Sequence, residues 1–278
     1  MKIERNINNL GALIAILAAS TSTGWAATLF DANVTPDVIF GSGNLNGGFT
    51  VTNIIRPPLS VPSIELGLRA KLRFNALNQP ENTFNSNGDG TYDFPAGQPA
   101  GGGFGFAPGS SSTAIWNFEW SINTDILDAS DTPGGVLSDY TYELGIDFDP
   151  SAGTDFYTFD PINQPVADHA LGFNSTGNGA GTVNATPTYP ASISQFNVAQ
   201  NSWNMEFFDG PAGKTFDANV PGEYDIYLRI LENGTSIGET AIKVRSTSSV
   251  PDTGSSLILL SSAVLGLGGI HRRFFSRS

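Results

Sequence analysis

Apolar and polar side chains alternate strictly along three stretches of the chain. Every second residue is apolar from Ile64 to Phe74, and the same pattern runs from Ile115 to Ile122 and from Tyr140 to Phe148. Side chains of a β-strand point alternately to its two faces, so this spacing places one face in a core and the other in water. The pattern predicts three half-buried strands.

A fourth alternating stretch contains a hairpin signal. Apolar residues alternate from Tyr224 to Ile230 and again from Ile237 to Val244, with Asn233 and Gly234 between the two runs. Asn-Gly between alternating runs favours a two-residue type I′ turn, because both residues accept a positive φ. We therefore expect an antiparallel hairpin over these residues.

Shorter apolar runs and long polar segments complete the pattern. Further strands are expected over Phe49–Ile55, Phe156–Phe159 and Trp203–Phe208. The segments 95–112 and 174–190 are rich in Gly, Pro, Ala, Ser or Asn and are expected to be loops. About eight short strands separated by turns predict an all-β fold, a single β-sandwich or jelly-roll-like domain over residues 27–245.

The N-terminus has the pattern of a secretory signal peptide, residues 1–26. Lys2 and Arg5 precede an apolar run from Leu10 to Ala19, and small residues follow it. A charged start, a short apolar run and a small-residue site are what signal peptidase recognises. We expect cleavage between Ala26 and Ala27.

The C-terminal segment, residues 246–278, has three parts. A polar motif, Val250-Pro251-Asp252-Thr253-Gly254, precedes an apolar run over 257–270 and a basic tail over 271–278 that includes Arg272 and Arg273. As a helix, 14 apolar residues span about 21 Å, which makes a short transmembrane segment. Arginines after such a run stay on the cytoplasmic side and stop export there. The order predicts a C-terminal sorting signal.

This layout resembles the PEP-CTERM sorting domain of exported bacterial proteins, in a variant with Val-Pro-Asp-Thr-Gly in place of Pro-Glu-Pro. The motif is also similar to the Leu-Pro-x-Thr-Gly signal of sortases, so a sortase-like enzyme is the alternative. The resemblance implies processing by an exosortase, a membrane enzyme of bacteria that make exopolysaccharide. It further implies a chain held at the membrane by its C-terminal helix and then released to the cell surface or matrix.

Segments of the β-domain resemble PEP-CTERM proteins of unassigned function. These segments are Trp116–Trp120, Tyr142–Pro150 and Asn201–Met205. The resemblance implies export and brings no catalytic residues with it.

Charge limits the choice of partners. Residues 27–249 contain eight basic and 24 acidic residues, a net charge of −16, and the chain has no cysteine. Such a surface repels nucleic acid and anionic lipid. Stability must come from packing, or from packing with bound ions, because disulfides are excluded.

The densest group of carboxylates is the candidate cation site. Asp147, Asp149, Asp155 and Asp160 lie close together in the sequence, and calcium prefers oxygen ligands. The alternative is that these residues favour turns and stay solvated. A second Asn/Asp/Gly-rich segment, 85–93, lacks the final glutamate of a calcium loop and is expected to be a hairpin turn.

Signals for catalysis are weak. His169 is the only histidine between the two targeting segments, and no nucleophile motif accompanies it, so it is expected to be a surface turn residue. Pairs of carboxylates suited to a glycosidase are too numerous to select one. Trp203, Tyr157 and Tyr227 are the aromatic residues considered for stacking on sugars.

The sequence therefore predicts a non-enzymatic, exported protein of the cell envelope or of an exopolysaccharide biofilm matrix. Signal peptidase and an exosortase-like enzyme are the expected processing partners, exopolysaccharide is a candidate ligand, and nucleic acid is not expected. The alternative function is a carbohydrate-binding surface module assisted by calcium. A glycan hydrolase ranks third.

Overall fold

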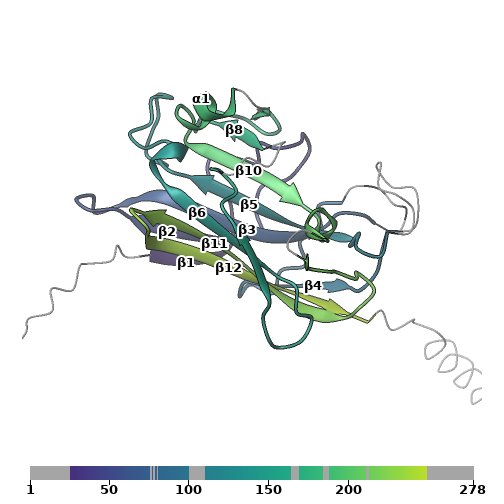
Figure 1. The fold of residues 1–278 in the computed structure, drawn as a ribbon. Coiled ribbons are helices and arrows are strands. Elements are labelled where there is room, and N and C mark those ends of the chain that lie inside the picture. The colour runs from purple at the N-terminus through teal and green to yellow at the C-terminus, as the bar shows by residue number, and fades with distance from the viewer. Residues whose placement is uncertain are drawn as a thin grey trace, which may run out of the picture.

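The fold comes from a computed structural model. It describes residues 26–248 apart from 76, 78, 80, 100–109, 164–168, 184–187 and 211–212. Two β-sheets form the framework of this part of the chain and pack against each other (Figure 1). The predicted all-β fold with two sheets is confirmed. None of the described helices is long and apolar enough to cross a membrane, and the run 257–270 lies outside the described residues.

The larger sheet has seven strands, all paired antiparallel. Their order is β1 (Ala26–Ala32), β2 (Phe49–Ile55), β3 (Pro62–Leu72), β5 (Trp116–Asn123), β10 (Val198–Trp203), β8 (Ala170–Gly172) and β9 (Thr182–Val183). Among the elements that the structure describes in full, three short helices lie in the connections: η1 (Leu137–Asp139), α1 (Tyr189–Ile193) and η2 (Met205–Phe208).

The smaller sheet has five strands. Their order is β4 (Thr91–Pro95), β12 (Thr235–Thr247), β11 (Gly222–Glu232), β6 (Thr141–Asp147) and β7 (Phe156–Phe159). The β4–β12 pair is parallel and the other pairs are antiparallel. The strands predicted over 49–55 and 156–159 match β2 and β7.

The predicted hairpin is present as β11 and β12. Glu232 pairs with Thr235, and the two residues between them, Asn233 and Gly234, have φ values of 49° and 75°. Positive φ at both positions is the requirement of a type I′ turn. The prediction is confirmed.

The turn supports a specific stability prediction. Gly234→Ala is expected to lower the free energy of unfolding by about 1 kcal/mol, because a Cβ is strained at positive φ and nothing lies within 4 Å to compensate. Urea denaturation measures the change. Gly177→Ala is a matched control, since this glycine also has open space around it but no positive φ. Equal effects of the two substitutions would contradict the assignment.

The main core lies between the sheets. Leu68 and Trp120 of the larger sheet and Leu144, Ile226 and Leu228 of the smaller sheet are each 0% exposed. All five lie on the apolar face of an alternating stretch. The alternation therefore identified the residues that hold the two sheets together.

The predicted exposure of the second face was wrong for β3 and β5. Every residue of β5, and all but the end residues of β3, are buried. Residues 33–48, here named the covering loop, lie over this face and contribute Val38 and Ile39 to a second apolar cluster. The covering loop therefore excludes water from the polar side chains of this face.

The strand predicted over 203–208 was also wrong beyond its first residue. Trp203 ends β10, and residues 205–208 form η2. The side chain of Asn204 accepts from the N–H of Glu206 and so caps this helix, while its amide donates to the carbonyls of Ala114 and Trp116. These bonds turn the chain at Asn204.

In the 85–93 segment, Ser86 pairs with Tyr92 across the expected turn.

Candidate functional site

Polar side chains on β3, β5 and β10 form a buried layer beneath the covering loop. This polar layer comprises Glu65, Arg69, Lys71, Asn117, Glu119, Ser121, Asn123 and Gln200, none of them more than 6% exposed. The strand register places Arg69 opposite Glu119 and Lys71 opposite Asn117. The layer therefore follows from the alternation that also builds the main core on the other face.

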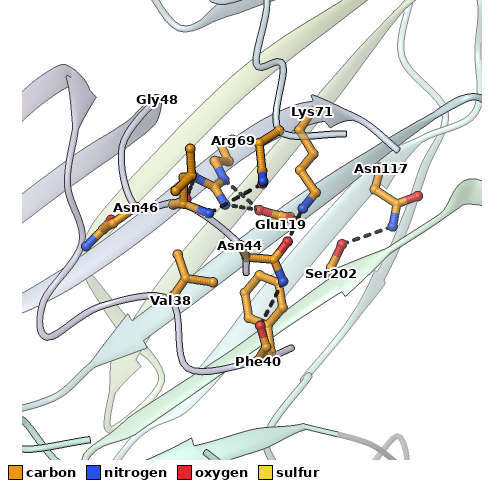
Figure 2. Close-up of polar contacts among 12 residues, drawn as sticks. Val38, Phe40, Asn44, Asn46, Gly48, Arg69, Lys71, Asn117, Glu119 and Ser202 are labelled. Carbon is orange, nitrogen blue, oxygen red and sulfur yellow. Dashed lines mark hydrogen bonds and ion pairs between the residues drawn. The ribbon is translucent and has the colours of Figure 1, made fainter. Parts of the chain in front are cut away.

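An ion network occupies the centre of the polar layer. Glu119 accepts from Arg69 at 2.5 Å and lies 3.0 Å from the Lys71 ammonium (Figure 2). The Arg69 and Glu119 side chains are 0% exposed and that of Lys71 is 8% exposed. Burial opposes ionisation of Glu119, but the two adjacent cations hold its pKa below the usual value.

The same cations bind the covering loop to the sheet. Arg69 donates to the carbonyls of Leu45 and Gly47 at 2.8 and 2.6 Å. Its guanidinium lies between two aromatic rings, 4.1 Å from Phe49 and 4.3 Å from Phe84. Lys71 donates to the side chain of Asn44. The loop is therefore held by charge-assisted hydrogen bonds from beneath.

Glu65 is a second carboxyl group of the polar layer. Burial and hydrogen bonds from Thr35 determine its pKa, and no cation contributes to the shift. Its carboxyl group accepts from the N–H and hydroxyl of Thr35 at 2.7 and 3.2 Å. Burial raises its pKa to about 7, although the hydrogen bonds from Thr35 oppose the shift. Glu65 is thus a buried carboxyl group that titrates near neutral pH.

A groove lies beside residues 39–44 of the covering loop and next to Lys71 of the polar layer. Its volume is about 580 Å³. It is lined by residues 39–44, by Lys71, Arg73, Glu81, Asn82 and Ala170, by Gly179, Gly181 and Val183, and by Asn201, Ser202 and Phe207.

The lining of the groove is chemically mixed. Phe207 offers an aromatic ring that is 54% exposed, and Lys71 contributes an ammonium group that also contacts Glu119. Ser202 pairs with Glu119 across the sheet and so belongs to the polar face. Such a site suits a ligand that combines many hydrogen-bonding groups with an apolar face.

Three of the four carboxylates predicted as calcium ligands serve local turns, and the fourth forms an ion pair. Asp147 accepts from the N–H groups of Asp149 and Asp155 at 3.0 and 2.7 Å. Asp149 in turn accepts from the N–H of Ser151 at 2.9 Å, and Asp155 forms an ion pair with Lys214. Each of these carboxylates is used by a different neighbour.

Asp160 lies away from this group. Its carboxylate accepts from the N–H of Tyr142 at the start of β6, whereas Asp147 ends that strand. Within the described part of the chain, no three His, Asp or Glu side chains are grouped to hold a metal ion. The structure does not bring the four predicted calcium ligands together: Asp147, Asp149 and Asp160 accept from turn backbone N–H groups, and Asp155 pairs with Lys214.

Two expectations about single side chains were wrong. His169 is 0% exposed, with its Nε2 against the carbonyl of Pro161 and its ring 5.1 Å from that of Trp120. Trp203 is 2% exposed and packs in the same aromatic cluster. Neither residue is a surface residue: Trp203 ends β10, His169 directly precedes β8, and both lie in the core.

Of the two predicted processing sites, the signal-peptide site alone lies within the described residues. Ala26 and Ala27 are exposed at the start of β1, where Ala27 pairs with Asn53. The sorting motif Val250–Gly254, the apolar run and the basic residues Arg272 and Arg273 lie outside the described residues.

Comparison with known proteins identifies the C-terminal segment. Residues 249–274 match the family model described as the VPDSG-CTERM motif. No curated protein and no solved structure matches the chain. Thr253 stands where the motif's name has serine. The chain thus carries a variant of the PEP-CTERM-type sorting signal, which marks an exported protein processed by an exosortase-type membrane system.

Proposed function

We propose that the protein is a non-enzymatic component of the cell envelope or of an extracellular polysaccharide matrix. The sorting signal at 249–274 carries this proposal, because it directs the chain out of the cytoplasm and to an exosortase-like enzyme. The net charge of −16 over 27–249 supports it, since such a domain is repelled by nucleic acid and anionic lipid.

The use of the acidic residues supports a non-catalytic role. Asp147 and Asp160 accept hydrogen bonds from turn backbones, and Glu119 is enclosed by two cations. A general acid or base must reach the proton that it transfers. Carboxylates that already accept backbone hydrogen bonds or pair with buried cations are poorly placed to transfer a proton to or from a substrate.

Mass spectrometry of the mature surface protein tests the sorting proposal. We expect an N-terminus at Ala27 and no peptides from residues 257–278. Pro251→Ala is expected to leave the tail attached, because it alters the motif that the enzyme recognises. Pro221→Ala, at an exposed proline of the β-domain, is the matched control and should be processed normally. Intact tail peptides in the surface form of the unaltered protein would contradict the proposal.

A carbohydrate-binding surface module is the second candidate function. The groove beside Phe207 favours it, because a binding module requires an exposed site of this kind. Calcium assistance has no comparable support, since Asp160 lies apart from the other three candidate ligands, and those three carboxylates accept from backbone N–H groups or pair with Lys214.

A further inference from the structure

We propose that the groove binds a neutral oligosaccharide, such as a segment of a polysaccharide chain. This inference rests on the proposed function, because a location outside the cell decides which ligands the groove meets. The ligand class follows from the size, charge balance and lining chemistry of the groove.

The dimensions of the groove suit a short oligosaccharide. A volume of about 580 Å³ lies within the range of small-molecule sites. Close backbone packing forms one wall: a Cβ on Gly179 would lie 2.5 Å from the backbone of Ser42, and one on Gly181 would lie 2.8 Å from the carbonyl of Ile39. Glycines here bring the β8–β9 segment against the covering loop. The groove is therefore shaped by contacts between well-packed segments.

The charges around the groove are balanced. Lys71 lies 3.0 Å from Glu119, which also pairs with Arg69. Burial lowers the pKa of Arg73, and the attraction of Glu206 and Glu119 opposes that shift. Glu81 adds a third carboxylate to the three cations. A ligand with a net charge gains little here, and an acidic one is also repelled by the acidic domain.

The remaining chemistry fits the two-sided character of a sugar ring. Ser202 and Asn82 provide a hydroxyl and an amide group, which donate and accept as sugar hydroxyls do, whereas the Asn44 amide already donates to the carbonyls of Phe40 and Gly41. Two of the three Lys71 donors have partners in Asn44 and Glu119, which leaves one for a ligand. The exposed Phe207 ring can pack against the apolar C–H face of a sugar.

Affinity electrophoresis of the purified full-length chain in mild detergent tests this inference. Gels contain dextran, glucomannan or galactomannan as neutral polymers, or alginate as an acidic one, at constant ionic strength. We expect at least one neutral polymer to slow migration, and Phe207→Ala to weaken that binding roughly tenfold. Ser42→Trp, at an exposed position on the groove, is expected to block binding by occupying it.

Phe30→Ala is the matched control. Phe30 is also an exposed phenylalanine, 45% against 54% for Phe207, but it lies on β1 outside the groove lining. The Phe30→Ala variant should bind the neutral polymer as tightly as the unaltered chain does. Retardation by alginate alone, or equal binding by the Phe207→Ala and unaltered chains, would overturn the inference. So would the absence of retardation in all three neutral polymers. The assay uses purified protein and does not depend on exosortase processing. A negative result would therefore count against oligosaccharide binding and leave the sorting proposal to the mass spectrometry experiment.

Discussion

Glu119→Gln is expected to lower the free energy of unfolding by about 3 to 5 kcal/mol. The substitution keeps the shape of the side chain but leaves Arg69 and Lys71 buried without their carboxylate. An uncompensated charge in a dry interior is far more costly than the loss of a surface ion pair. Urea denaturation at pH 7, extrapolated to water, measures the change.

Glu239→Gln is the matched control for this prediction. Glu239 also pairs with an arginine, Arg229, at 2.5 Å, but its side chain is 42% exposed. We expect a change within about 1 kcal/mol there. Similar small effects at both positions would show that water reaches Glu119 and that the network is not sealed by the covering loop.

The second large effect concerns pH. Between about pH 4.5 and pH 7 the folded chain holds a proton on Glu65 that the unfolded chain releases, because burial raises the folded pKa to about 7. Stability from this group is therefore complete below pH 4.5 and declines as pH rises to about 7. Raising the pKa of Glu65 from 4.5 to about 7 corresponds to roughly 3 kcal/mol of stability.

Comparison with Glu65→Gln isolates this contribution from other titrating groups. Glutamine stays neutral and still accepts a hydrogen bond from Thr35, so the variant should gain about 2.5 kcal/mol relative to the unaltered chain between pH 5 and pH 8. Urea denaturation at both pH values provides the difference. A constant difference across this range would show that Glu65 is already ionised at pH 5.

The strands were predictable where the sequence repeats every second residue. The β11–β12 hairpin and the core faces of β3 and β5 follow from local alternation and turn chemistry. The burial of their second faces was not predictable, because the covering loop has no regular period. Val38 and Ile39 complete an apolar cluster only after the loop has crossed the sheet.

The candidate sites were harder to predict, for a related reason. Proximity in sequence suggested that Asp147 and Asp160 meet, but they lie toward opposite ends of β6. Conversely, Arg69 and Glu119 are 50 residues apart and meet only through the β3–β5 register. Opposite charges at alternating strand positions were the available signal, and it requires the pairing of the strands to be known.

The length of β12 also sets a molecular distance. At about 3.3 Å per residue, its 13 residues span roughly 43 Å. The strand begins beside the Asn233-Gly234 turn and ends at Thr247, just before the sorting signal. While the tail is attached to a membrane, the turn is therefore separated from the attachment end by a strand that is paired with β11 except at the register shift beside Ile237. Pairing with β11 holds this distance constant, so a label at the hairpin tip would report a constant distance from Thr247.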